Sequence, residues 1–221
     1  MKLISPGASN PKTAKSEQLG YETGILHLAP HTQSGWNVCP SASEGCASAC
    51  LYHQGRGRMS SVQNARLRKT TMYFQERELF LNLLEKDIAS IVRRADRKGY
   101  QPCVRLNGTS DIRWERHGIM EKFPEVQFYD YTKIVNRRDL PDNYSLTFSR
   151  SECNQDSVEQ ALSNGMNVAA VFNELPSEWM GLPVIDGDEH DLRFKDPKPC
   201  IVGLLAKGSA KKDDSGFVIF Q

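Results

Sequence analysis

Residues 80–111 read FLNLLEKDIASIVRRADRKGYQPCVRLNGTSD and combine a helix, a stop and a strand in one unit. Gly99 is a typical helix stop, and the stretch before it predicts an amphipathic helix with one apolar face, formed by Phe80, Leu84, Ile88, Ile91 and Ala95. Residues 102–106 then form an apolar run that predicts a strand, which ends in a polar turn at 107–111. This stretch therefore predicts a helix that returns directly into a buried strand.

The same alternation continues along the chain. Further apolar runs predict strands at 24–29, 126–131, 145–149, 167–172, 183–185 and 200–205. Helical patterns separate some of these runs, at 114–123 and 156–164. Short apolar strands that alternate with helices indicate a parallel sheet covered on both faces. We therefore predict an α/β fold, more specifically a partial parallel (β/α) barrel, as one domain over 21–221 after an extended lead-in over 1–20.

Composition and charge exclude several classes of protein. The chain has 221 residues, with 28 Lys and Arg against 27 Asp and Glu and a formal net charge of +1. The length suits one domain, and the charge shows no domain-wide basic excess of the kind that nucleic-acid binding favours. No apolar run approaches the roughly 18 residues that span a bilayer, and no apolar signal core precedes residue 21. We expect a cytoplasmic monomer that makes no contact with a membrane.

Three cysteines fall within twelve residues in the polar loop 31–61. They are Cys39, Cys46 and Cys50, spaced C-x6-C-x3-C with mostly small residues between them. Converging thiolates are soft ligands that select zinc, copper(I) or an iron–sulfur cluster. Structural zinc usually needs a second cysteine pair, whereas the other cysteines of this chain are isolated. The loop therefore predicts a [4Fe-4S] cluster with one iron left without a cysteine, and buried or disulfide-bonded cysteines are the alternative.

The open iron needs a fourth ligand. A small molecule, water or another side chain can take that position, and His31 and His53 are the nearest candidates along the chain.

A strand followed by a three-cysteine loop and a series of βα units resembles the radical S-adenosylmethionine (SAM) superfamily. That resemblance implies a [4Fe-4S] cluster in the loop after the first barrel strand. Two features depart from the superfamily pattern: the cysteine gaps are longer, and Ala49 stands where an aromatic residue is usual. The stretch 107–111 also lacks the paired glycines and the glutamate that grip SAM. The resemblance therefore implies cluster binding more strongly than SAM cleavage.

Nearly the whole chain also resembles a family of bacteriophage proteins related to the "gene product 88" group. The landmarks of this resemblance are the segments 39–51, 104–111, 129–133, 146–152, 187–194 and 203–208. The resemblance implies a cluster and a fold more than a particular reaction. For a phage-encoded protein, the expected compartment is the host cytoplasm.

Polar residues follow several of the predicted strands, where parallel sheets place their sites. The turn Asn107, Gly108, Thr109 and Ser110 is the candidate cofactor-binding segment, although Ser110 or Asp111 capping a helix is an alternative. We predict a structural ion pair for Asp130 with Lys133 or Arg105. The candidate pocket residues are Arg105, Asn107, Asp111, Tyr131, Lys133, Ser149 and Asn173.

Two charged segments suggest further functions. Four acidic residues and His190 lie within 186–191, which suggests either a Mg²⁺ or Ca²⁺ site or a solvated loop. A basic run after the cysteine loop suggests charge balance for a cluster, or phosphate or RNA contacts: Arg56, Arg58, Arg66, Arg68 and Lys69.

Three functions follow from these features. The first is an iron–sulfur protein with a redox or radical reaction on a small molecule at the open iron. The second is a cluster-stabilised module, not an enzyme, that binds nucleic acid or a host protein. The third is a zinc- or magnesium-dependent hydrolase.

Overall fold

The fold is built on one sheet, seen in a computed structural model that describes residues 1–7 and 11–221. Ten strands take part among the described residues. In the order of pairing they are β1 (Ile4–Pro6), β2 (Tyr21–Leu26), β3 (Gln101–Arg105), β4 (Gln127–Thr132), β5 (Tyr144–Ser149), β6 (Val168–Phe172), β9 (Ile201–Leu205), β8 (Leu182–Asp186) and β7 (Glu178–Trp179), with β10 (Val218–Ile219) paired to β6.

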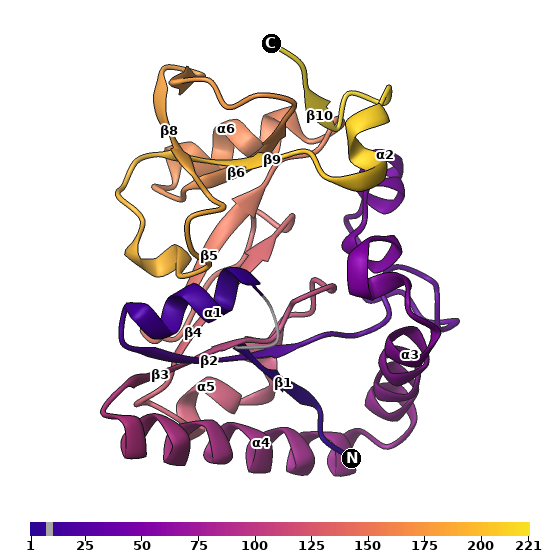
Figure 1. The fold of residues 1–221 in the computed structure, drawn as a ribbon, viewed down its shortest axis with the longest axis vertical. Coiled ribbons are helices and arrows are strands. Elements are labelled where there is room, and N and C mark those ends of the chain that lie inside the picture. Colours follow the sequence, from indigo (N-terminus) through magenta and orange to yellow (C-terminus); the bar gives the residue numbers. More distant parts are fainter. Residues whose placement is uncertain (8–10) are drawn as a thin grey trace.

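The centre of this sheet is parallel. Every neighbouring pair from β2 to β8 along the order is parallel, whereas β1 runs antiparallel to β2 and β7 antiparallel to β8. The carboxyl ends of the parallel strands therefore lie at one edge, and the chain leaves β2 at this edge for the cysteine loop (Figure 1). The predicted α/β class and parallel sheet are confirmed. In the described chain the order ends at β1 and β7, so the sheet is open and does not confirm a barrel.

Helices connect and cover the strands. The α-helices are α1 (Pro11–Gln18), α2 (Glu44–Ser48), α3 (Ser60–Gln75), α4 (Arg77–Lys98), α5 (Ile119–Lys122) and α6 (Gln155–Ser163). The 3₁₀ turns are η2 (Leu51–His53), η3 (Gly55–Arg58), η4 (Trp114–His117), η5 (Arg193–Lys195) and η6 (Gly208–Lys212). Among the described residues, none of these helices has the length and apolar character that crossing a membrane requires.

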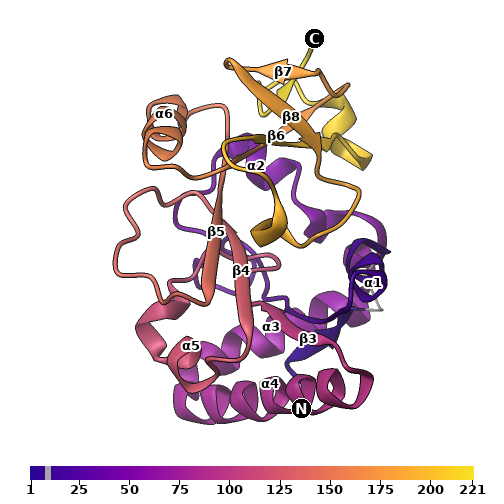
Figure 2. The same ribbon diagram turned by 90° about the vertical axis from the view of Figure 1, so that its left-hand side faces the viewer.

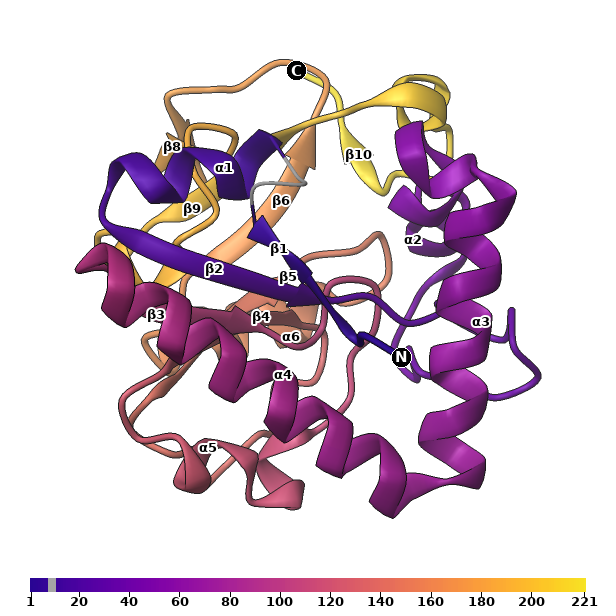
Figure 3. The ribbon, with the colours of Figure 1, turned by 60° about the horizontal axis from the view of Figure 1, so that its bottom comes forward.

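The long helix α4 covers the outer face of β2 and β3 (Figure 3). Its buried residues are the five predicted from the spacing, Phe80, Leu84, Ile88, Ile91 and Ala95. Gly99 ends the helix in the left-handed conformation at φ 66°, and its N–H bonds back to the Asp96 carbonyl. A side chain at this φ would be strained, which explains the glycine. The sequence prediction for this unit is confirmed in full.

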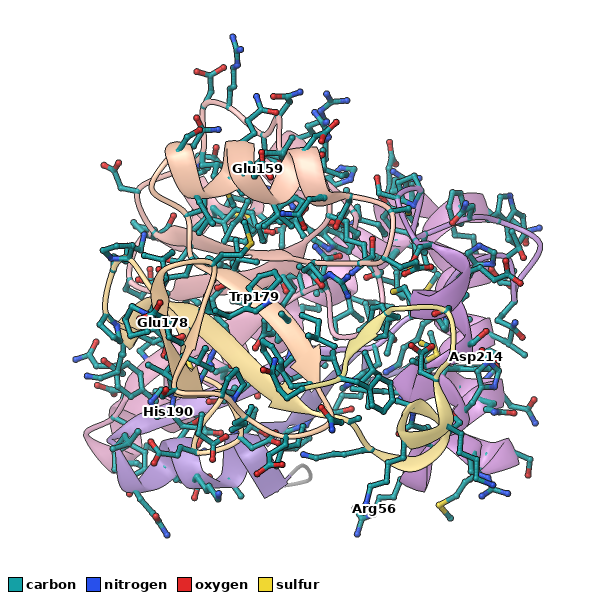
Figure 4. The ribbon with its side chains drawn as sticks, turned by 90° about the horizontal axis from the view of Figure 1, so that it is seen from above. Arg56, Glu159, Glu178, Trp179, His190 and Asp214 are labelled. Atoms are coloured by element: carbon teal, nitrogen blue, oxygen red, sulfur yellow. The ribbon has the colours of Figure 1, made fainter. Side chains whose placement is uncertain are left out.

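The outer face of the second half of the sheet is covered by α6 and the β7 hairpin. Trp179, labelled in Figure 4, sets its ring edge against Phe172 of β6, with 5.9 Å between the ring centroids. Val158 and Ala161 of α6 are buried in the same cluster. The two halves of the sheet thus have separate outer cores.

The opposite, inner face is covered by α1 and by the chain around η5. Figure 1 shows α1 and α4 on opposite sides of β2, and Figure 2 shows α1 and α6 on opposite sides of β4 and β5. Phe194 of η5 packs edge-on against Tyr21 and Tyr129, at centroid distances of 5.4 and 5.5 Å.

The prediction of an extended lead-in over 1–20 is wrong. Residues 4–6 pair with the edge of β2, where Pro6 is tolerated because edge strands leave some N–H groups unpaired. Residues 11–18 form α1, which begins at a proline, as helix first turns allow. The part of this prediction on residues 8–10 lies outside the described residues. The helix predicted over 114–123 is divided into η4 and α5 by Gly118, at φ 65°.

Replacing Leu84 by alanine tests the contribution of the α4 core. Leu84 is fully buried, so the smaller side chain removes apolar contacts and leaves a cavity. We expect the free energy of unfolding to fall by about 2–5 kcal/mol, measured by urea denaturation. Leu79→Ala is the matched control, because Leu79 is 45% exposed on the same helix. An equal loss in both variants would contradict the assigned helix face.

Candidate metal centre

The cysteine loop lies at the carboxyl edge of the sheet and is anchored at its centre. Cys46 lies in α2, whose first turn is capped by Ser43: the Cys46 N–H donates to Ser43 Oγ at 3.2 Å. Glu152, after β5, accepts from the Gly45 N–H at 2.8 Å and from Ser43 Oγ at 2.7 Å. The segment around Cys46 is therefore attached to the loop after β5, which is far from it in sequence.

The three loop thiols are free, half-buried and electrostatically coupled. Burial, with smaller contributions from the neighbouring Cys50 and Cys46, raises the pKa of Cys39 to about 12. Burial and Cys46 likewise raise the pKa of Cys50. Cys39 and Cys50 are therefore each disfavoured as thiolates by burial and by another cysteine of the loop. A bound cation would reverse this effect and favour three thiolates.

Backbone donors approach two of these sulfurs. The backbone of His31 lowers the pKa of Cys39 and that of Tyr52 lowers the pKa of Cys50, in both cases against the larger effect of burial. N–H···S hydrogen bonds are one of the features that stabilise iron–sulfur clusters. The donor chemistry of the loop therefore fits a thiolate-bound cluster.

The sulfurs do not form a preassembled ligand set. Among the described residues, no three His, Cys, Asp or Glu side chains are grouped closely enough to hold a metal ion. Sites whose ligands come together only when the metal binds are common, because converging thiolates repel one another. The two predicted fourth ligands are not grouped with the thiols: the His53 side chain is exposed, and His31 Nδ1 lies 3.3 Å from Thr32 Oγ1.

The turn after β3 lies against the cysteine loop. Cys39 Sγ donates to the Thr109 carbonyl at 3.7 Å, and Thr109 Oγ1 donates to the Leu28 carbonyl at 2.6 Å. Gly108 is packed so closely on β2 that a Cβ would lie 2.7 Å from the Leu26 carbonyl oxygen and 2.8 Å from the His27 ring. The structure thus brings the predicted cofactor-binding segment to the cysteines.

The Asn107 side chain organises this turn from within. Its Oδ1 accepts from Ser110 Oγ at 2.8 Å, the Ile112 N–H at 2.9 Å and Trp114 Nε1 at 3.1 Å. The helix cap predicted for Ser110 or Asp111 is therefore wrong, since η4 begins later and has no side-chain cap. Asn107 has both a donor and an acceptor, which lets it join the turn to the next strand.

Asp111, Lys133 and Ser149, three of the candidate pocket residues, are joined by hydrogen bonds. Asp111 accepts from the Lys133 N–H and from Thr132 Oγ1, both at 2.8 Å. Lys133 Nζ donates to Ser149 Oγ at 2.7 Å. The Lys133 charge lowers the pKa of Cys50, while the Asp111 charge raises that of Cys39. Three successive strand ends therefore supply polar groups to the site.

Arg105 and Tyr131 lie together on the inner face. The Arg105 guanidinium stands 4.7 Å from the centre of the Tyr131 ring, and its Nη1 lies 3.1 Å from Asp191 Oδ2. Tyr129 donates to the same carboxylate at 3.2 Å. Asp191 comes from the acidic segment 186–191, so part of that segment is used in a buried ion pair.

Asp186, Asp188 and His190 of this segment also have partners. Lys207 Nζ lies 2.9 Å from Asp188 Oδ1, and the Asp186 side chain accepts from the Asp188 N–H. His190, labelled in Figure 4, is joined to Arg193 through its ring nitrogen and its carbonyl. These contacts divide the acidic residues among separate partners and do not form a cation site among the described residues.

Asn173 is not part of this site. Its N–H donates to the Ile219 carbonyl, and its Oδ1 accepts from the Gln221 N–H, each at 3.0 Å. Its polar side chain therefore anchors β10, which the sequence gave no reason to expect at this position.

The prediction that Asp130 forms an ion pair with Lys133 or Arg105 is wrong. Asp130 accepts from the Asn107 N–H at 2.7 Å and from Tyr144 OH at 2.9 Å. It points to the opposite face from Arg105, since side chains alternate along a strand. Burial raises the pKa of Asp130 to about 7, although the Arg105 charge and these hydrogen bonds oppose the shift.

Sequence reasoning missed His27 and the burial of part of the basic run. His27 follows β2 and packs on Gly108. Burial, together with the charges of Arg66, Arg105 and Lys69, lowers its pKa to about 3, so its imidazole is neutral at neutral pH. Lys69 is buried and donates to the Leu3 carbonyl at 2.6 Å. Strand alternation was the signal that could have found His27, because it places the His27 side chain on the opposite face from Leu26 and Leu28.

A comparison with protein families matches Gene product 88 over residues 2–221. The chain therefore belongs to the Gene product 88 family of bacteriophage proteins, which confirms this part of the resemblance seen in the sequence. Searches of curated proteins and of solved structures found no match.

The pH dependence of stability tests the role assigned to Asp130. Its folded-state pKa of about 7 lies above the ordinary value of 3.8, so folding favours the protonated form. This stability is fully present below the ordinary value and is lost as the pH rises through about 7. Asp130→Asn keeps an acceptor for Asn107 but removes the titration. We expect its unfolding free energy to depend less on pH than that of the wild type, by urea denaturation at about pH 5 and about pH 8.

The exposed neighbour Asp142 supplies the control for this experiment. Asp142→Asn should keep the wild-type pH dependence. If Asp130→Asn also keeps it, Asp130 does not carry a proton in the folded protein.

Proposed function

We propose that Cys39, Cys46 and Cys50 bind a [4Fe-4S] cluster and that the protein performs a redox or radical reaction on a small molecule at the iron without a cysteine. The observation that carries this proposal is the presence of three free, half-buried thiols in one loop at the carboxyl edge of the sheet. Soft thiolate ligands favour such a cluster.

A partial barrel of the radical SAM type is the architecture that we propose for this site. The strands β2 to β6 neighbour one another in chain order, which is the order that successive βα units of a barrel produce. The cysteine loop follows β2, the first of these parallel strands. SAM is a further candidate ligand, for which the segment 107–110 beside Cys39 would be the binding turn.

When bound, the cluster would supply an electron and a Lewis-acidic iron. The protein residues around it have separate tasks. Arg66 and Lys133 provide positive charge next to Cys50 and would balance the negative charge of a cluster with three thiolates. Asn107 holds the turn that faces Cys39. Asp111, Lys133 and Ser149 form the polar chain that would orient a ligand at the open iron.

A second proposal is a cluster-stabilised module, not an enzyme, that binds nucleic acid or a host protein. It rests on Arg58 and Arg68, which are exposed on η3 and α3 directly after the cysteine loop. The hydrolase alternative has less support, because the acidic residues Asp188 and Asp191 pair with Lys207 and Arg105.

Serine substitution of each loop cysteine tests cluster binding. Anaerobically purified wild-type protein should be brown and contain about four iron and four sulfide per chain. Cys39→Ser, Cys46→Ser and Cys50→Ser should each lose most of this iron, because serine does not replace a thiolate ligand. Metal analysis and the visible absorption spectrum provide the measurement. A colourless wild-type protein with one zinc per chain would refute the cluster.

The remaining cysteines are the internal controls. Cys103 and Cys200 are buried, and Cys153 is exposed. Serine at these positions should leave the iron content unchanged, and a loss would reveal a fourth cysteine ligand. Addition of SAM and a reductant then separates the two proposals: release of 5′-deoxyadenosine supports a radical enzyme, whereas its absence favours the module.

A further inference from the structure

An excess of buried positive charge lies next to the cysteine loop. Arg66, on α3, is half-buried with its guanidinium 5.7 Å from the centre of the Tyr52 ring. Its Nε and Nη1 are buried and have no hydrogen-bond partner. The Cys50 thiol and the Tyr52 ring are the groups beside it. Buried N–H groups without partners are uncommon and costly, so these two call for an acceptor.

Two further donors, Arg105 Nε and Tyr131 OH, are buried without a hydrogen-bond partner on the inner face of the sheet. The charges of Arg66 and Arg105 both act on the His27 ring. His27 follows the end of β2 and is packed on Gly108 of the turn that contacts Cys39.

The charges in this region do not cancel. Asp191 neutralises Arg105, and Lys69 is held by a carbonyl oxygen, which is not charged. Arg66 therefore brings a positive charge that has no carboxylate partner. A guanidinium presents a planar pair of N–H donors that matches the two oxygens of a carboxylate or phosphate.

We propose that Arg66 provides an anion-binding site that takes the carboxylate or phosphate group of a small molecule next to Cys50. In the proposed function, Arg66 would hold the ligand of the open iron by its carboxylate or phosphate group. The biological role of the anion site therefore rests on the proposed function. The anion site itself depends only on groups of this chain. Its ligand would thus be an anionic molecule that contacts the cluster loop and the turn 107–110 together.

Isothermal titration calorimetry on the anaerobically purified protein tests this site with two probes, inorganic phosphate and SAM. We expect one of them to bind and Arg66→Gln to weaken that binding at least about tenfold, the usual effect of losing a charge-assisted hydrogen bond. Arg68→Gln removes an exposed charge two residues away and should bind as the wild type does. Binding of phosphate alone indicates a phosphate ligand, and binding of SAM indicates a carboxylate ligand.

A second variant keeps the test decisive if Arg66→Gln does not fold. Arg66→Lys retains the stem and the charge but not the planar pair of donors, and it should bind several-fold more weakly than the wild type. The inference is overturned if neither probe binds, or if the folded Arg66 variants bind with wild-type affinity. Iron content measured on the same samples separates the two proposals. Protein with a cluster but no anion binding refutes only the anion site, and anion binding without iron refutes only the cluster.

Discussion

The hydrogen bonds between Asn107 and Asp130 are the constraint on which the candidate site depends. Asp130 accepts from the Asn107 N–H at 2.7 Å, and Tyr144 OH holds the other carboxylate oxygen at 2.9 Å. Asn107 in turn fixes the segment that places the Thr109 carbonyl at Cys39. The side-chain contacts of β3, β4 and β5 therefore determine where the first cysteine meets the sheet. Because a raised pKa keeps this carboxyl protonated more readily, the pair avoids most of the cost of a buried charge.

Charge balance links the turn held by Asn107 and Asp130 to the cluster binding proposed beside it. Burial and the neighbouring cysteines disfavour thiolates at Cys39 and Cys50. The positive groups nearby act in the opposite direction: Lys133 and Arg66 both lower the pKa of Cys50. This arrangement disfavours thiolates at Cys39 and Cys50 without a metal and suits them once positive iron is present. The same surplus positive charge attracts an anion, so one set of residues serves both proposals.

The sequence was informative wherever periodicity decides the structure. The α4 face follows from the spacing that burial imposes, the seven parallel strands from their apolar runs, and the Gly99 stop from the left-handed backbone that glycine adopts without strain. The partner of Asp130 did not follow, because alternation gives the face of a side chain but not the residue that a neighbouring strand places opposite it. Asn173 looked like a site residue for the same reason, since a position after a strand does not reveal that β10 returns to pair there. The contact of Cys39 with Thr109 agrees with the general expectation that polar residues after neighbouring parallel strands lie at one edge of the sheet.

The inner face of the sheet limits where a ligand can be held. The segment around η5 fills this face with two ion pairs, Arg105 with Asp191 and Arg193 with Asp196. The side chains of Arg193 and Asp196 are each 1% exposed, and Leu192 between the pairs is fully buried. Replacing such contacts costs more than displacing solvent, because each separated partner would be left as a buried charge. The unpartnered donors of Arg66 instead lie toward Cys50, at the carboxyl edge. The polar groups that a ligand can satisfy without breaking the fold are therefore those beside the cysteine loop.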